Sequence, residues 1–144
     1  MPSALIEAPG MKIQFLIEGS DTNDSISIFR CDFEAGARSP MPHSHDGFDE
    51  TVVLLSGEFT MVVDGVVHTL LEGDSIHVPR GVVHGFGVKG EASILAISTP
   101  GLFGSAYFRE MADALNVDGP PDRELMIAIQ KRHGLTPALP QAAR

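Results

Sequence analysis

The stretch "GDSIHVPRGVVH", Gly73 to His84, indicates how this chain folds. It begins with Gly-Asp at a turn, continues as a short β-prone run, breaks at Pro-Arg-Gly and resumes as a second run that carries His84. Val and Ile favour strands, whereas Gly and Pro interrupt them. The stretch therefore predicts two short strands joined by a tight turn, with His84 just beyond the turn.

A second polar stretch lies upstream, where "PHSHDGFDE" over 42–50 places two histidines and three acids in nine residues. Side chains two apart in a strand point to the same side, so His43 and His45 should aim at one spot. Gly47 allows the chain to bend, after which Glu50 can point into the same space. A hairpin then returns the chain and brings His84 onto a neighbouring strand.

The carboxylate of this set has two candidates. In an unbroken strand Asp49 would share the side of the histidines, whereas a bend before it and the spacing to the glycine turn at Gly57 favour Glu50. Three imidazoles and one carboxylate suit Fe, Mn, Co, Ni, Cu or Zn, and not Ca or Mg, which prefer oxygen shells. Four protein ligands leave a coordination position open, as in reactive metal sites.

Most of the chain has the pattern of short strands with turns between them, which is typical of a β-sandwich or barrel. Asp64-Gly65 is a strong signal for a two-residue hairpin turn. The expected strands are 11–17, 25–33, 50–56, 59–63, 66–70, 74–79, 82–88 and 92–98.

From residue 105 the pattern becomes helical, with helices expected over 105–116 and 123–133. The apolar stripe of the first helix is interpreted as a packing surface; it comprises Tyr107, Phe108, Met111 and Leu115. The predicted organisation is a barrel over 1–104, a helical extension packed on it over 105–134, and a loose tail over 135–144.

Composition limits the functions that this chain of 144 residues can have. Its net charge of −9 argues against nucleic acid and anionic lipid as partners. No apolar run reaches the ~18 residues of a membrane-spanning helix. Cys31 is the single cysteine and is expected to be buried and unreactive. With no partner for an internal disulfide, the expected location is the reducing cytoplasm.

Together the two stretches give the spacings H-x-H-x4-E-x6-G and G-x5-P-x-G-x2-H, and on these motifs the region from Gly36 to Pro100 resembles the cupin superfamily. The resemblance implies an all-β double-stranded β-helix, or jelly-roll, here followed by two α-helices. It also implies one divalent transition metal per chain, held by His43, His45, Glu50 and His84. Iron is the first expectation, with Mn, Ni, Co, Cu and Zn as alternatives. Two departures are a first glycine one position further upstream than usual, and a valine, Val88, at a frequent asparagine position.

The surroundings of the metal are expected to be apolar, which is typical of a small-molecule pocket. By strand parity the expected lining residues are Phe59, Met61, Val63, Phe86 and Val88, with Phe48 beside the ligand loop. A small apolar or aromatic substrate is expected, and no catalytic residue beyond the ligands is identifiable.

The resemblance extends to quercetinase-like small cupins, which makes a metal-dependent dioxygenase the first hypothesis. Alternatives are a redox-neutral isomerase or lyase acting on a carbonyl compound, and a non-enzymatic binding module. The run "TVVLL" is apolar on both faces, so we expect a partner subunit to cover its outer side in a homodimer.

Overall fold

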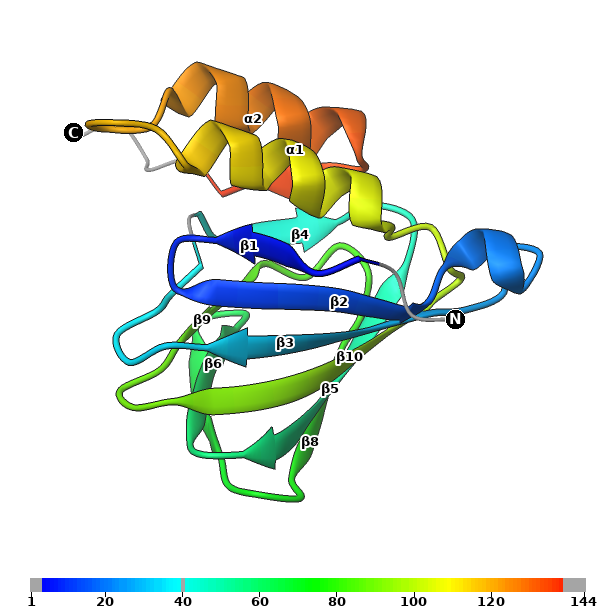
Figure 1. The fold of residues 1–144 in the computed structure, drawn as a ribbon. Coiled ribbons are helices and arrows are strands. Elements are labelled where there is room, and N and C mark those ends of the chain that lie inside the picture. Colours follow the sequence, from blue (N-terminus) through cyan, green and yellow to red (C-terminus); the bar gives the residue numbers. More distant parts are fainter. Residues whose placement is uncertain (1–3, 40, 139–144) are drawn as a thin grey trace, which may run out of the picture.

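The computed structural model describes residues 4–39 and 41–138, which form two antiparallel sheets with a pair of helices across one end (Figure 1). The larger sheet has the strand order β1-β2-β3-β10-β5-β8 and the smaller one β11-β4-β9-β6-β7. The strands are β1 (Ile6–Ala8), β2 (Met11–Ile17), β3 (Ser27–Phe33), β4 (His43–His45), β5 (Asp49–Ser56), β6 (Phe59–Val63), β7 (Val66–Leu70), β8 (Ser75–Val78), β9 (His84–Gly87), β10 (Ala92–Thr99) and β11 (Leu135–Pro137). This arrangement is the expected jelly-roll.

Alternation along the strands builds the core between the two sheets. In β10 the even-numbered residues Ile94, Ala96 and Ser98 are buried, while the residues between them lie on the outer face. The β6–β7 hairpin turns at Asp64 and Gly65, whose φ angles are 50° and 78°. Both positive values are those of the two-residue turn that the sequence predicted.

The helical extension consists of two α-helices, α1 (Ser105–Leu115) and α2 (Arg123–Arg132). A short 3-10 turn, η1 (Gly19–Asp21), lies earlier in the chain, between β2 and β3. Asp122 caps α2, because its side chain accepts a hydrogen bond of 3.2 Å from the backbone N–H of Leu125. Gly134, with φ of 78°, follows the end of α2. Both helices lie within a residue of the predicted bounds.

The C-terminal segment differs from the sequence prediction of a loose tail over 135–144. Residues Leu135–Pro137 form β11, which pairs antiparallel with β4, the strand that carries His43 and His45. Leu135 is fully buried, and this burial stabilises the pairing. Residues 139–144 lie outside the described part of the chain.

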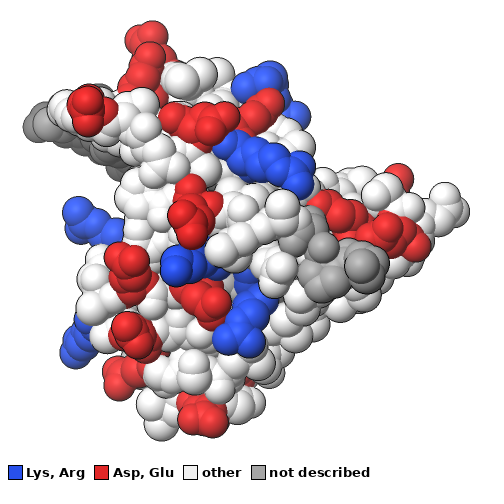
Figure 2. Space-filling model, in the orientation of Figure 1, with Lys and Arg blue, Asp and Glu red and all other residues white. Residues whose placement is uncertain are grey.

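On the face that Figure 2 shows, basic side chains lie scattered among acidic ones and do not form a patch. Within the described residues, neither helix is long and apolar enough to cross a membrane.

Candidate metal centre

Three histidines from two adjacent strands of the smaller sheet converge at the helical end of the molecule. His43 on β4 pairs directly with His84 on β9, and paired residues point to the same side. His45 lies two residues beyond His43, so its ring returns to that side. One ligand atom from each imidazole lies within 4.8 Å of the others, a spacing that a single ion can bridge.

Backbone carbonyls orient two of the three rings. Nδ1 of His43 lies 3.0 Å from the carbonyl oxygen of Met41, and Nδ1 of His84 lies 3.0 Å from that of Val82. A ring that donates Nδ1–H to a carbonyl presents the lone pair of Nε2, which is the arrangement of most metal-binding histidines.

His45 supplies the test of whether a metal fits. Its ring is buried, and neither Nδ1 nor Nε2 has a hydrogen-bond partner within the described chain. Buried polar atoms nearly always have a partner, so these nitrogens call for an atom that the chain does not supply. A metal ion bound to one of them would meet that need, and the donor set fits a transition metal.

Burial also keeps the imidazoles neutral. Desolvation lowers the pKa of His45 to about 2 and that of His43 to about 4, and the neighbouring His84 adds to both shifts. The pKa of His84 is lowered as well, chiefly by desolvation. Only the neutral imidazole can bind a metal, so the site holds its histidines in the ligating form at neutral pH.

One backbone and one side-chain hydrogen bond hold the ligand strand in place. The N–H of Gly81, in the turn between β8 and β9, donates to the carbonyl of His45 at 2.7 Å. On the other side of β4, Thr136 of β11 donates its hydroxyl hydrogen to Asp46 at 2.7 Å. The ligand strand is therefore fixed between the Pro-Arg-Gly turn and the C-terminal strand.

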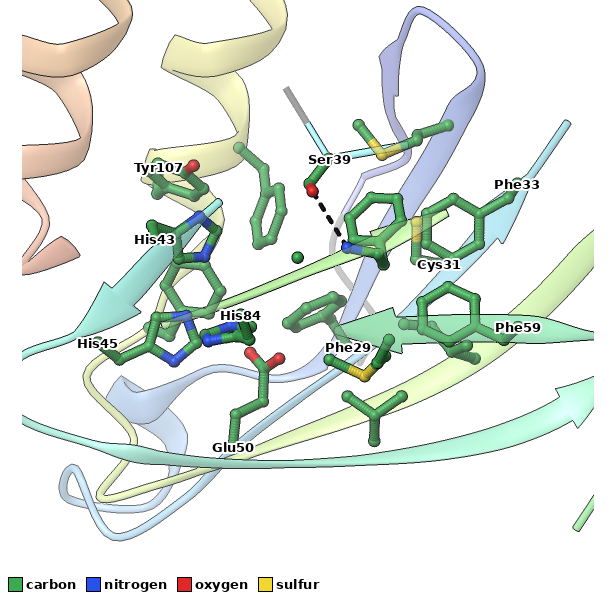
Figure 3. Close-up of a pocket in the computed structure, with 18 of the residues that line it drawn as sticks. Phe29, Cys31, Phe33, Ser39, His43, His45, Glu50, Phe59, His84 and Tyr107 are labelled. Carbon is green, nitrogen blue, oxygen red and sulfur yellow. Dashed lines mark hydrogen bonds between the residues drawn. The ribbon is translucent and has the colours of Figure 1, made fainter. Parts of the chain in front are cut away.

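Glu50 and Asp49 point to opposite sides of β5. Glu50 is buried in the same cavity as the histidines, and its carboxylate extends toward His84 (Figure 3). Desolvation raises its pKa to about 7. Asp49 lies on the outer side, where Arg80 donates to it from both the backbone N–H and Nε. The bend before β5 resets the side-chain phase, so Glu50 is the acid that faces the cavity, although it lies outside the group of closely spaced ligand atoms.

The cluster opens onto a cavity of about 90 Å³ between the sheets and α1 (Figure 3). Apart from the cluster, its walls are mainly aromatic and aliphatic. Ser39 adds a hydroxyl, which accepts a hydrogen bond of 3.1 Å from the N–H of Phe86. The remaining lining residues are Met11, Phe29, Cys31, Phe33, Val52, Phe59, Met61, Gly85, Phe86, Ile94, Phe103, Tyr107, Phe108 and Met111.

Of the pocket residues expected from strand parity, Phe59, Met61 and Phe86 line the cavity. Phe48, Val63 and Val88 do not. Phe48 stacks on the ring of His45 with centroids 4.4 Å apart, so it supports the ligand from behind. Val63 lies at the hairpin end of β6, and Val88 is buried beyond the end of β9, where its backbone bonds to Ala37.

The interpretation of the α1 stripe as a packing surface alone is wrong, because Tyr107, Phe108 and Met111 also line the cavity. Tyr107 is buried and its hydroxyl has a side-chain hydrogen bond with Gln130 of α2. Burial raises the pKa of Tyr107 to about 12. A stripe at helical spacing looks the same whether it meets a core or a cavity, so no local signal could have separated the two.

The other histidines lie away from the cluster. His68 and His77 are exposed, and Nδ1 of His77 lies 2.9 Å from the hydroxyl of Thr51 on the outer face of the larger sheet. His133 follows α2 and contacts Glu110 at 2.8 Å. Cys31 is buried and free, as expected, and desolvation raises the pKa of its thiol.

Known proteins share this fold. Residues 29–98 match the family model described as "Cupin domain". This chain carries a cupin domain. The cupin region is 35% identical over 72 residues to quercetin 2,3-dioxygenase of Bacillus subtilis (strain 168), a match that covers 49% of this chain and 21% of that protein. It is 36% identical over 72 residues to an uncharacterised protein of Aquifex aeolicus (strain VF5), covering 49% of this chain and 60% of that one.

Solved cupins have the same architecture. An RmlC-like cupin from Shewanella frigidimarina matches with a TM-score of 0.60 and 27% identity over 68% of this chain and 84% of that one. A sugar phosphate isomerase of the cupin superfamily from Silicibacter pomeroyi matches with a TM-score of 0.55 and 26% identity, covering 63% and 60% of the two chains. Cupins of different activity therefore share this barrel, and function has to be argued from the site.

Proposed function

We propose that this cupin is a metal-dependent dioxygenase acting on a small organic molecule, with His43, His45, His84 and Glu50 as ligands of one divalent transition metal. The observation that carries the proposal is the convergence of three buried imidazoles on an apolar cavity. Nitrogen-rich mixed sites suit Fe, Mn, Co, Ni, Cu and Zn, and we expect iron first. The similarity to a quercetin 2,3-dioxygenase supports the same class of reaction.

The residues of this chain would bind the substrate and exclude water. The bound metal would hold an oxygen-bearing substrate and O2 together and let electrons pass between them. Phe29, Phe86 and Phe103 would contact the hydrocarbon part of the substrate and keep the site dry. The carbonyl contacts to His43 and His84 would keep the rings from turning when substrate enters.

Sugar phosphates fit this cavity poorly, which weakens the isomerase alternative. Among the described residues that line the cavity there is neither Lys nor Arg. Phosphate groups are usually held by such side chains or by helix N-termini. A pure binding module, the third hypothesis, has no need of three converging imidazoles.

The first experiment is elemental analysis of the purified protein, followed by oxygen-electrode measurements with a flavonol, a catechol and a β-diketone. We expect about one transition metal per chain, and uptake of O2 with at least one substrate. Labelled O2 should place both oxygen atoms in the products, as the term dioxygenase requires. Turnover that continues without O2 would instead support the redox-neutral alternative.

We also propose that the protein is a cytoplasmic homodimer. Val53, Leu95 and Ile97 lie half-buried on the outer face of the larger sheet, beside Leu55, which is 37% exposed. A second subunit would cover these apolar side chains. Light scattering at micromolar protein should give twice the mass of one chain, and Leu95→Glu should halve it; a monomeric wild type would contradict the proposal.

A further inference from the structure

The inner faces of three neighbouring strands of the larger sheet become polar at one level, beside the candidate metal centre. There Glu50 on β5 pairs with Ser98 on β10, and Ser98 pairs in turn with Ser27 on β3. Paired residues point to the same side, and all three are buried. These three residues are here called the polar row. At the next two levels the paired inward residues are Val52, Ala96 and Phe29, then Leu54, Ile94 and Cys31.

One member of the polar row has no use for its polar group within the described chain. The Ser27 hydroxyl donates to the carbonyl of Phe103 at 2.8 Å, and the Glu50 carboxylate extends into the cavity toward His84 (Figure 3). Ser98 has no exposed surface, and its Oγ has no hydrogen-bond partner. A buried hydroxyl without a partner is unfavourable. The position of Ser98 therefore calls for an acceptor close by.

The Glu50 carboxylate is the acceptor that the register places beside Ser98. Directly opposite residues on antiparallel strands have Cβ atoms roughly 4.5 to 5.5 Å apart. The serine hydroxyl turns about one torsion with three staggered positions, so it can face its neighbour without any change in the backbone. Strand β10 lies between β3 and β5, so its backbone carbonyls are engaged in the two ladders. A hydrogen bond to a carboxylate is also stronger than one to a neutral acceptor.

We infer that Ser98 is a positioning residue of the metal centre: its hydroxyl donates to one oxygen of the Glu50 carboxylate and so turns the other oxygen toward the histidines. The inference rests on the proposed function, because it takes Glu50 as a metal ligand. Ser98 does not line the cavity, so it acts through Glu50 and does not touch substrate. Outer partners of this kind typically change metal affinity by ~10- to 100-fold.

The first test is the affinity of the full-length protein for cobalt(II), measured by competition with a chromogenic chelator. Ser98→Ala should weaken cobalt binding about tenfold, since the carboxylate loses its donor. Ser93→Ala is the matched control, because Ser93 lies on the outer face of the same strand, where its hydroxyl bonds to Asp32. The control should keep wild-type affinity. Wild-type affinity in Ser98→Ala would overturn the inference.

A double-mutant cycle tests whether Ser98 acts through Glu50. If it does, adding Ser98→Ala to Glu50→Gln should change cobalt affinity by less than about twofold, because residues that share one interaction are not additive. A merely structural role for Ser98 would leave its effect the same in both backgrounds. An undiminished tenfold loss in the Glu50→Gln background would therefore overturn the inference.

Urea unfolding of the chelator-treated protein separates positioning from support of the fold. Ser98→Ala removes a hydroxyl that has no partner in the described chain, so its midpoint should stay close to that of wild type. A large decrease of the midpoint would show a structural role and count against the inference. Ser98→Cys keeps the size of the side chain with a weaker donor, so its cobalt affinity should be intermediate, and it replaces Ser98→Ala if that variant does not fold.

The Glu50→Gln variant distinguishes failure of this inference from failure of the proposed ligand set. Weaker cobalt binding in Glu50→Gln, together with wild-type affinity in Ser98→Ala, would reject the role of Ser98 and keep Glu50 as a ligand. Wild-type affinity in Glu50→Gln would remove the carboxylate from the ligand set, and the inference about Ser98 would be rejected with it.

Discussion

Strand β5 carries a carboxylate on each of its two faces, and both carboxylates have histidine nearby. On the inner face Glu50 shares a cavity with His43, His45 and His84, and burial raises its pKa to about 7. On the outer face Asp49 bonds to Arg80, whose N–H groups lower its pKa, and its carboxylate lies 3.8 Å from His77. The same residue types therefore form an ion-pair cluster in solvent and a candidate ligand set in the interior.

The difference between the two faces shows which surroundings leave the ring nitrogens of a histidine free to bind a metal. The outer cluster consists of Asp49, Thr51, His77 and Arg80, and its polar atoms bond to one another. Nδ1 of His77 contacts the hydroxyl of Thr51, and Asp49 accepts a hydrogen bond from Arg80. The inner cluster contains a ring with two unpartnered nitrogens. Water can replace any lost contact outside, whereas inside the missing partner has to come from a bound species.

The largest expected effect is on metal binding. His45→Ala and His84→Ala should each lose nearly all bound metal, because each removes one of three converging nitrogens. His77→Ala is the matched control on the outer face and should keep wild-type content. Inductively coupled plasma mass spectrometry on dialysed protein measures the three variants. Undiminished metal content in both His45→Ala and His84→Ala would show that these histidines do not bind the metal, and the proposed difference between the two faces of β5 would be wrong.

The next largest expected effect is a difference between the two carboxylates in their contribution to metal affinity. Glu50→Gln should weaken metal affinity by at least the ~10- to 100-fold typical of losing a partner in a metal site. Asp49→Asn should leave affinity unchanged, because its side chain points away from the cavity. Competition titration against a chromogenic chelator gives both constants. Equal affinities in the two variants would remove Glu50 from the ligand set.

Acid should destabilise the metal-free protein through the inner cluster. The pKa values of His43 and His45 fall from 6.5 to about 4 and about 2 on folding. Below pH 6.5 the unfolded chain therefore binds protons that the folded chain does not, and the free energy of unfolding decreases as pH falls. Glu50 acts in the opposite sense between 4.5 and about 7, because its raised pKa favours folding at the lower pH.

Urea unfolding in the presence of chelator, at pH 6.5 and pH 4, measures whether the histidines or Glu50 have the larger effect on the free energy of unfolding. Two strongly shifted histidines, assisted by His84, outweigh one glutamate, so the midpoint should be lower at pH 4. His45→Gln should show a smaller decrease than wild type. A midpoint that rises on acidification would show that Glu50 dominates.

The smallest expected effect is on the outer face. Thr51→Val removes the hydroxyl that contacts His77, on an exposed surface where water replaces the lost bond. Its urea midpoint should stay close to that of wild type, and metal content should not change. A large loss of stability would mean that the outer cluster is more than a solvated ion-pair group.

Much of the fold was predictable because the signals are local. The Asp64-Gly65 turn, the strand alternation and the cap at Asp122 each depend on neighbours in sequence, and the structure has all of them. The short strand β11 was not predictable, because three residues carry too little pattern. It forms only through its pairing with β4.

The sequence by itself determined an all-β sandwich or barrel, because strand period and turn chemistry act over a few residues. It also determined the motif spacings that resemble those of cupins and so implied the jelly-roll and the grouping of His43, His45 and His84. The tertiary structure alone decided which side of β5 faces the cavity, and that Tyr107, Phe108 and Met111 close it. Those outcomes depend on packing between segments far apart in the chain. A side chain's own neighbours in sequence do not specify which distant surface it meets.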